Sequence, residues 1–155
     1  MKKSVILALL FALPPLAQAD FSGRVVRVID GDTLSVLSGN EMYRVRLNGI
    51  DAPESKQAYG QRSKQSLIKL AAQKNVLVVS NKQDRYGRFL GTVMNGNLNI
   101  NAEQVKAGMA WAYRFHGKAT DMNMLVLEKS ARLSGVGLWT EPNPVEPWKW
   151  RNKKN

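Results

Sequence analysis

The feature that most constrains the fold is a run of three short β-type segments within residues 24–50. Residues 24–37 hold two runs rich in β-branched side chains on either side of Asp30-Gly31, a residue pair that strongly favours a tight hairpin turn. Residues 42–50 then alternate apolar and polar side chains, which is the period of a strand with one buried face. Because the connections are short, we expect three consecutive strands paired as a meander.

The middle of the chain is expected to add a helix and the remaining strands. Residues 58–72 place apolar side chains at helical spacing among lysines and glutamines. Residues 76–80 return to a β-rich run, and residues 88–100 form another that an Asn95-Gly96 turn interrupts. Together with the N-terminal meander, these segments give roughly five short strands.

Two further helices complete the prediction. Asn101 and Gln104 have the spacing of an N-cap and its capping partner, so a short helix is expected to begin there and to end at Gly108. A last helix is expected over residues 121–133, before Gly135. This order of elements favours a small closed barrel with about three packed helices, which is an α+β, mainly β, fold.

The first 19 residues have the three parts of a secretory signal peptide and are not expected to join the fold. Two lysines form a positive n-region, and the apolar run that follows is too short to span a bilayer. Ala17-Gln18-Ala19 fits the small-residue rule for cleavage, so we expect export and a mature chain that begins at Asp20. An uncleaved anchor or a buried N-terminal helix is the alternative.

Composition narrows the chemistry. The chain has no cysteine, which removes thiolate catalysis and cysteine-ligated zinc and requires that a packed core provide the stability. Its formal charge of +11 favours a polyanion as partner, although a generic basic surface would give the same charge. We expect one domain at residues 20–140 and a basic tail at residues 141–155, where Trp148 and Trp150 either stack on bases or pack on the barrel.

Three acidic residues lie at the ends of predicted strands. Asp32 follows the first hairpin turn, and Asp51 and Glu54 flank Pro53. The proline ring restricts its own backbone and biases Ala52 towards an extended conformation. Carboxylate oxygens with a main-chain carbonyl suit Ca²⁺ or Mg²⁺, so Asp32 and Asp51 would be two ligands if the hairpin lies against the end of the third strand. Both stretches are also common turn sequences, and turn formation alone is the alternative.

Three arginines accompany these acids. Arg46 lies on the polar face of a predicted strand, and Arg85 and Arg88 flank a Tyr-Gly pair beside another. Arginine is suited to bidentate recognition of phosphate oxygens. Hard-metal carboxylates, a spare glutamate and several arginines together match phosphoryl transfer, in which catalysis is mostly positioning and neutralisation of charge. Salt bridges from the arginines to the same acids are the alternative.

The stretches VIDGDT, YRVRLNGIDAPES and DRYGR occur in this order and together resemble the thermonuclease family, the calcium-dependent enzymes similar to micrococcal nuclease. The resemblance extends to GMAWAY and GLW, and so covers nearly the whole mature chain. It implies an oligonucleotide-binding-type (OB-type) five-stranded barrel with three helices. It also implies Ca²⁺ as the cofactor and hydrolysis of DNA and RNA that leaves 3′-phosphate ends; we expect a monomer without stable membrane association.

The resemblance implies a role for each matching residue. A hydroxyl residue often stands at the position of Ala52, so a side-chain bond would be missing here while the carbonyl is kept. A carboxylate at Glu54 would either take a proton from the attacking water or only orient that water. The implied calcium ligands are Asp32, Asp51 and the Ala52 carbonyl, the catalytic residues are Arg46, Glu54 and Arg88, and the substrate contacts are Arg85, Tyr86 and Tyr113.

Two other functions compete with a nuclease. A non-catalytic nucleic-acid-binding module could have the same fold, since fold alone does not fix function, but such a module could dispense with the acids or the arginines. An envelope protein that binds anionic lipid would be expected to carry a basic amphipathic helix, and none is apparent in this sequence. The lone His116 has no visible partner in the sequence and is expected to be a surface residue.

Overall fold

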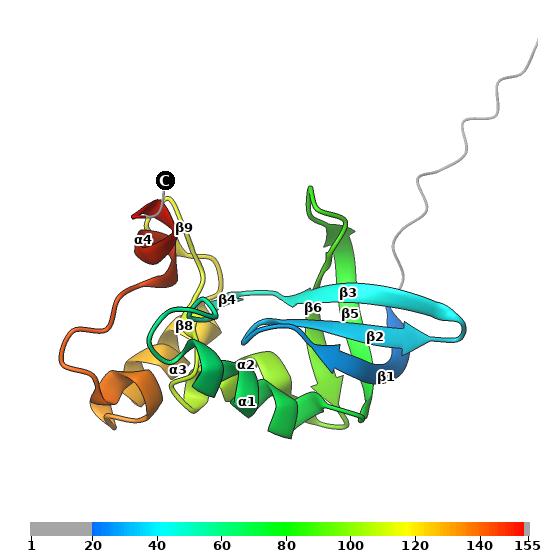
Figure 1. Cartoon of the computed structure of the whole chain (residues 1–155), viewed down its shortest axis with the longest axis horizontal. Coiled ribbons are helices and arrows are strands. Elements are labelled where there is room, and N and C mark those ends of the chain that lie inside the picture. The colour runs from blue at the N-terminus through cyan, green and yellow to red at the C-terminus, as the bar shows by residue number, and fades with distance from the viewer. Residues whose placement is uncertain (1–19, 154–155) are drawn as a thin grey trace, which may run out of the picture.

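The computed structural model describes residues 20–153 and shows a small closed β-barrel with helices gathered at one end (Figure 1). The strands of the sheet follow the order β3-β2-β1-β5-β6-β7, and a parallel pairing of β3 with β6 closes the barrel. The predicted α+β, mainly β, class and the five-stranded OB-type barrel are confirmed. The barrel strands are β1 (Phe21–Val28), β2 (Thr33–Ser38), β3 (Glu41–Leu47), β5 (Asn75–Gln83) and β6 (Phe89–Asn95), and β7 (Leu98–Asn99) pairs with β6.

The predicted N-terminal meander is present. Strand β2 pairs antiparallel with β1 on one side and with β3 on the other. The alternation in β3 places Val45 and Leu47 fully inside the barrel and leaves Arg46 between them on the other face. Barrel closure pairs Arg46 with Leu90 of β6, and therefore brings the end of β3 beside the start of β6, where Arg88 lies.

Aliphatic side chains fill the barrel. Each fully buried valine or leucine contributes about 1.5–3 kcal/mol relative to exposure, which is how a chain without disulfides obtains its stability. The fully buried members of this core include Val25, Leu34, Val36, Val45, Leu47, Val78 and Val93.

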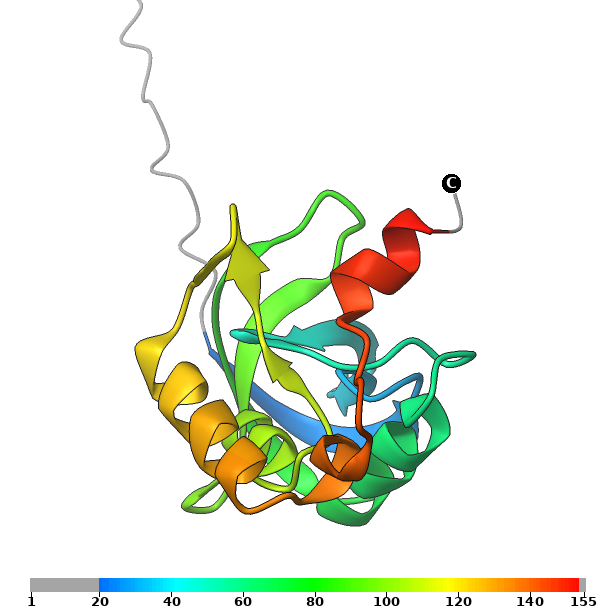
Figure 2. The same cartoon turned by 90° about the vertical axis from the view of Figure 1, so that its left-hand side faces the viewer.

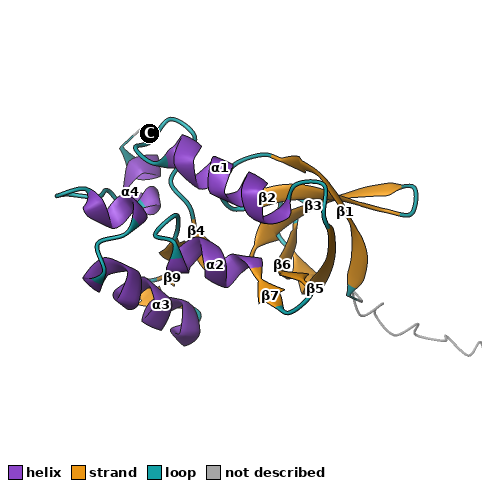
Figure 3. Ribbon diagram, turned by 90° about the horizontal axis from the view of Figure 1, so that it is seen from below, coloured by secondary structure: helices purple, strands orange, loops and turns teal. Residues whose placement is uncertain are grey.

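The helices lie together at one end of the barrel, as Figure 3 shows. Asp121 caps the N-terminus of the third, close to the predicted start of that helix. A fourth helix, near the C-terminus, was not predicted from the sequence. The helices are α1 (Gly60–Ala71), α2 (Ile100–Lys106), α3 (Met122–Leu133) and α4 (Pro147–Asn152), with a 3-10 turn, η1 (Gly137–Thr140), before α4.

Four two-residue strands lie outside the main sheet. β4 (Ile50–Asp51) pairs with β8 (Trp111–Ala112), and β9 (Arg114–Phe115) pairs with β10 (Lys118–Ala119). The first pair extends from the end of β3 towards the helices and holds part of the site described below.

The predicted N-cap of α2 is wrong. The capping residue is Asn99, whose side chain accepts a hydrogen bond from the backbone nitrogen of Ala102 at 3.0 Å. Asn101 and Gln104 are fully buried instead, and their amide groups bond to backbone atoms of neighbouring segments. The spacing of a capping box depends only on local sequence, whereas the burial of these two amides depends on how α2 packs.

The predicted signal peptide, residues 1–19, lies outside the described residues. Within residues 20–153, none of the helices has the length and apolar character needed to cross a bilayer.

Candidate active site

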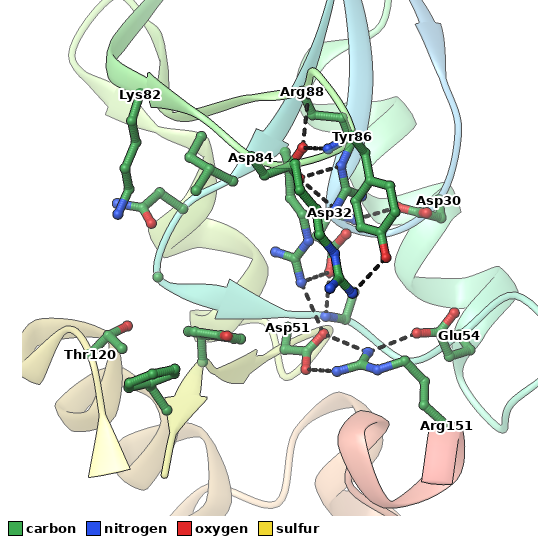
Figure 4. A pocket seen from close by; sticks show the side chains of 18 of the residues that line it. Asp30, Asp32, Asp51, Glu54, Lys82, Asp84, Tyr86, Arg88, Thr120 and Arg151 are labelled. Atoms are coloured by element: carbon green, nitrogen blue, oxygen red, sulfur yellow. Dashed lines mark hydrogen bonds and ion pairs between the residues drawn. The ribbon is translucent and has the colours of Figure 1, made fainter. Parts of the chain in front are cut away.

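An open cleft of about 790 Å³ lies between the β1–β2 loop, the β5–β6 hairpin and α4 (Figure 4). In Figure 2 the hairpin and α4 rise on the same side of the molecule. All nine residues that the sequence analysis assigned to a site line this cleft, although they come from distant parts of the chain. They are Asp32, Arg46, Asp51, Ala52, Glu54, Arg85, Tyr86, Arg88 and Tyr113.

The β1–β2 loop holds Asp32 by both carboxylate oxygens. Oδ2 accepts a hydrogen bond from the backbone nitrogen of Ala52 at 2.8 Å, and Oδ1 accepts one from the Thr33 hydroxyl at 3.1 Å. The loop packs closely on α1, where a Cβ at Gly31 would overlap the Ser63 hydroxyl. Only glycine therefore fits at that position, and the orientation of Asp32 is fixed by its surroundings.

A buried glutamine of α2 supports the same loop. The side-chain nitrogen of Gln104 donates to the carbonyl oxygens of Gly31 at 2.8 Å and Ser63 at 3.0 Å. One fully buried amide thereby joins α1, α2 and the loop that carries Asp32. The residue predicted to cap a helix helps to position the site.

Asp51 lies at the floor of the cleft. It belongs to β4, where it pairs with Trp111 of β8, and it is only 1% exposed. Arg46 Nη2 lies 3.1 Å from Asp51 Oδ1 and 3.5 Å from Asp32 Oδ2. The two carboxylates therefore converge on one guanidinium nitrogen. Arg46 thus forms the salt bridges to the site acids that were the alternative to phosphate recognition.

The crowding of carboxylates shifts their acidity. Burial raises the pKa of Asp51, and the negative charge of Asp32 adds to this shift while Arg151 and Arg46 oppose it. Burial and the charge of Asp32 also raise the pKa of Asp30, to about 6. A nearby divalent cation would relieve the repulsion that contributes to both shifts.

The chemistry of Asp32 and Asp51 fits a hard cation in part. Both offer carboxylate oxygens at a buried position, and the main-chain carbonyl of Ala52 is the third oxygen implied by the family resemblance. Within residues 20–153, however, no three His, Cys, Asp or Glu side chains are grouped as a metal site. Two carboxylates and one carbonyl supply fewer than the roughly six to eight oxygens that calcium takes, so water and substrate oxygens would complete the shell.

Glu54 lies at the rim of the cleft, with 41% of its side chain exposed. Its Oε1 accepts a hydrogen bond from Arg151 Nη1 at 2.8 Å. The same guanidinium forms a fork on Asp51, with Nη1 3.1 Å from Oδ1 and Nη2 2.8 Å from Oδ2. An arginine of α4 that the sequence analysis did not consider therefore bridges two of the predicted site acids, as Figure 4 shows.

Arg88 is held by an acid that was not predicted. Its Nη2 and Nε lie 2.7 and 2.8 Å from Asp84 Oδ2, and Asp84 Oδ1 accepts from the backbone nitrogens of Tyr86 and Arg88. Although burial opposes the change, these donors lower the pKa of Asp84. The exposed Arg85 donates to the Tyr86 hydroxyl at 2.7 Å and, within residues 20–153, forms no ion pair.

The remaining predicted residues are also located. Tyr113 follows β8 and is half-buried; its ring lies 5.9 Å from the guanidinium carbon of Arg46. His116 is exposed, as predicted. The ring of Trp148 packs edge-on against Trp111 with centroids 5.6 Å apart, so packing, one of the two alternatives for the tail, is observed for this residue.

The cleft contains four charged residues that sequence reasoning missed: Asp30, Lys82, Asp84 and Arg151. Asp30 and Asp84 lie within the motifs VIDGDT and DRYGR, so their position in the sequence was an available signal. Arg151 had no such signal, because its approach to the cleft depends on how the tail folds back.

Comparison with known proteins agrees with this geometry. The profile of the family described as "Staphylococcal nuclease homologue" matches residues 44–141. The chain is 49% identical to a protein of Escherichia coli called "Protein ParB", over all of this chain and 92% of that protein. It is 48% identical to a "Micrococcal nuclease" of Shigella flexneri, over 96% of this chain and 91% of that protein. An "Uncharacterized endonuclease" of Escherichia coli is 44% identical over 99% of this chain and its own full length. The chain therefore belongs to the staphylococcal nuclease homologue family.

Proposed function

We propose that this protein is an exported, Ca²⁺-dependent nuclease that hydrolyses phosphodiester bonds of DNA and RNA and leaves 3′-phosphate ends. The observation that carries the proposal is the convergence of two buried carboxylates, a partly exposed glutamate and several arginines on one cleft. The names of two relatives, a micrococcal nuclease and an endonuclease, support the same reaction class.

Glu54 is the residue that handles the attacking water in this proposal. The water oxygen attacks phosphorus, the bond from phosphorus to the 5′ oxygen breaks, and the 5′ oxygen leaves with a proton. The phosphate stays on the 3′ oxygen. The Glu54 carboxylate either takes the proton of the water or orients the water while solvent takes it.

Arg46 and Arg88 stabilise the negative charge that develops on the five-coordinate phosphorus. Each guanidinium is already oriented by acids, Arg46 by the two buried aspartates and Arg88 by Asp84. A guanidinium held in this way loses less freedom when it binds phosphate oxygens, and its direction is set before the reaction begins.

Asp32, Asp51 and the Ala52 carbonyl hold the cation in this proposal. When bound, calcium would neutralise charge on a phosphate oxygen of the substrate. The raised pKa values of Asp30 and Asp51 support a cation at this place, since they reflect carboxylates that are buried near one another.

Tyr86, Tyr113 and Arg85 contact the nucleic acid in the proposal. Tyr86 is 67% exposed at the edge of the cleft, and the guanidinium carbons of Arg85 and Arg88 lie 4.9 and 5.5 Å from its ring centroid, so the ring and the cations together offer a surface for a base and its phosphate. Stacking and phosphate contacts distinguish the four bases poorly, so cleavage is expected to depend little on sequence.

A binding module without catalysis is the competing function. It would need the basic surface but not the converging carboxylates, nor a glutamate at the rim of the same cleft. Export is a separate part of the proposal, supported by the sequence of residues 1–19 alone. Mass spectrometry of the exported protein is expected to give Asp20 as the first residue, and a retained Met1 would contradict export with cleavage.

The decisive experiment is digestion of plasmid DNA by the mature protein in Ca²⁺ and in chelator. Cleavage is expected in Ca²⁺ and not in chelator, and the new ends should become substrates for 3′ extension only after phosphatase treatment. Glu54→Gln, which keeps the shape of the side chain, is the matched control for contaminating nuclease. Wild-type protein that binds DNA in Ca²⁺ without cutting it would favour the binding module.

A further inference from the structure

The C-terminal helix α4 is anchored to the domain at several points. Pro147 occupies the first turn of α4 and is buried, and the ring of Trp148 packs on Trp111. Before the helix, the carbonyl of Val145 accepts a hydrogen bond from the Gln57 side chain. Packing and this hydrogen bond therefore hold α4 on the domain in addition to the ion pairs of Arg151.

The anchor of α4 is also part of the site. Trp111 pairs with Asp51 through the β4–β8 ladder, and its ring supports Trp148. One residue thus sets the position of both the buried carboxylate and the helix that carries Arg151. Contacts of Trp111 therefore place α4, and with it Arg151, beside Asp51.

The guanidinium of Arg151 keeps an unused edge. Both hydrogens of Nη1 are taken by Asp51 and Glu54, and one hydrogen of Nη2 is taken by Asp51. The Nε hydrogen and the second Nη2 hydrogen have no partner among residues 20–153, and they lie on one side of the planar group. Two parallel donors on one edge match a pair of phosphate oxygens.

The charge of the cleft also favours an anion as the ligand of Arg151. The cleft is lined by five acidic and five basic side chains, so it is close to neutral as it stands. A divalent cation shared with Asp51 would compete with Arg151 for the same oxygens and would leave the cleft positive. The edge of Arg151 that faces neither carboxylate can bind an anion with or without the cation, while Nη1 still contacts Glu54, beside the expected position of the attacking water.

We propose that Arg151 is a third phosphate-binding arginine of this site, which contacts the scissile phosphodiester together with Arg46 and Arg88. This inference rests on the proposed nuclease function for its substrate, a nucleic acid phosphodiester. Arg151 reaches the phosphate from α4, so the tail is part of the active site. An inhibitory role, in which Arg151 only blocks the cation position, is the opposite outcome of the same test.

The test compares Arg151→Ala, Arg151→Lys and Lys149→Ala in the full mature chain. Lys149→Ala removes the same charge from the same helix, and Lys149 pairs with Glu146 away from the cleft. Three quantities are measured: affinity for a short DNA oligonucleotide in chelator, single-turnover cleavage in Ca²⁺, and calcium affinity by calorimetry. Near-ultraviolet circular dichroism of the tryptophans checks that α4 stays packed.

Arg151→Ala is expected to lower oligonucleotide affinity and cleavage by about ten- to a hundredfold, the effect of losing a charge-assisted contact. Arg151→Lys should recover part of both, because lysine keeps the charge but not the fork. Lys149→Ala should stay close to wild type.

Equal behaviour of Arg151→Ala and Lys149→Ala would overturn the inference. Faster cleavage with tighter calcium binding in Arg151→Ala would overturn it too and would identify α4 as an inhibitory plug. If wild-type protein binds the oligonucleotide but does not cut it, the proposed nuclease function fails, and the affinities still decide whether Arg151 binds phosphate.

Discussion

Two buried carboxylates in this protein are each held by two arginines, yet their surroundings differ. Asp51 and Glu128 are both 1% exposed. Asp51 contacts Arg46 and Arg151, and Glu128 contacts Arg114 at 2.7 Å and Arg132 at 2.9 Å. By residue type alone the two clusters are almost the same.

The surroundings of Glu128 make a closed structural cluster. Its Oε2 also accepts from the backbone nitrogen of Ala112 at 2.7 Å, and the Arg132 guanidinium stacks on the Trp139 ring at 4.0 Å from the centroid. Neither Glu128 nor its two arginines line the cleft. Each carboxylate oxygen therefore has its partners within the fold, and none is left for a ligand.

Asp51, by contrast, belongs to an open cluster, which lines the cleft and contains two carboxylates that repel each other. A second carboxylate, Asp32, approaches the same arginine, and the cleft opens above both. The pKa of Asp51 is raised in spite of its two arginines. A buried carboxylate between arginines therefore indicates a ligand site only when a second negative charge and an open cleft accompany it.

The largest expected effect separates the two clusters by stability. Glu128→Gln should lower the free energy of unfolding by about 3 kcal/mol, because it removes the buried charge partner of the half-buried Arg114 and of the partly exposed Arg132. Asp51→Asn should cost much less, since burial and Asp32 already disfavour the charged form of Asp51. Urea unfolding in chelator measures both. A loss in Asp51→Asn as large as that in Glu128→Gln would show that both carboxylates serve mainly to stabilise the fold.

The next effect separates the cleft that contains Asp51 from the Glu128 cluster by catalysis. Arg88→Ala should slow single-turnover cleavage by about 10²-fold, because the guanidinium acts on charge that develops only in the transition state. Affinity for an uncleaved oligonucleotide should change far less, since other basic groups supply most of it. Glu54→Gln should behave in the same way.

The matched control for this prediction is Arg132→Ala, an arginine of the Glu128 cluster. It should lower stability but leave the cleavage rate of the folded protein unchanged, because Arg132 does not line the cleft. If Arg88→Ala loses affinity as much as rate, Arg88 holds the substrate and does not act mainly on the transition state.

A smaller effect concerns calcium. Asp51→Asn or Asp32→Asn should weaken calcium binding by about tenfold or more, because an amide keeps an oxygen but loses the charge on which an incomplete ligand shell depends. Glu128→Gln, compared at a temperature where it is folded, should bind calcium as wild type does. Calorimetry with unchanged affinity in both aspartate variants would show that the cation binds elsewhere.

The sequence predicted the strands and the motif residues well because both leave local patterns. The alternation in residues 42–50 requires Val45 and Leu47 to face the core, and the structure agrees. The order of elements favoured a closed barrel, but closure by parallel pairing of β3 with β6 has no local pattern and was not predicted. The misassigned cap at Asn101 shows the limit of spacing, since burial of the amide decides its partners.

The C-terminal tail was the least predictable part. Its tryptophans were compatible with packing or with base stacking, and nothing in the local sequence decides between them. The contact of Trp148 with Trp111 depends on the β4–β8 pair, which is itself only two residues long on each side. Arg151 could therefore be assigned to the cleft only after the tail had been placed.

The smallest expected effect tests whether like charges are truly crowded in the open cluster. Asp30 has a pKa of about 6 in the folded protein against a usual value of 3.8, because of burial and the charge of Asp32. Asp30→Asn removes the titration but keeps the side-chain oxygen that accepts from the backbone nitrogen of Asp32 at 3.0 Å. The pH dependence of the unfolding free energy is measured in chelator for wild type and Asp30→Asn, and the difference between the two gives the contribution of Asp30.

Proton linkage gives the sign of the change in stability with pH. Between about pH 4 and pH 6 the folded protein binds the Asp30 proton more tightly than the unfolded chain does. Raising the pH through this range therefore lowers the free energy of unfolding. The stability that the protonated group contributes is complete below pH 3.8 and is lost as the pH rises through about 6. Wild type should therefore lose about 1 kcal/mol relative to Asp30→Asn across this range, after allowance for solvent screening of a half-buried group. Parallel stability curves would mean that burial and the charge of Asp32 together do not raise the pKa of Asp30. The carboxylates of the cleft would then be less crowded than the contrast with Glu128 requires.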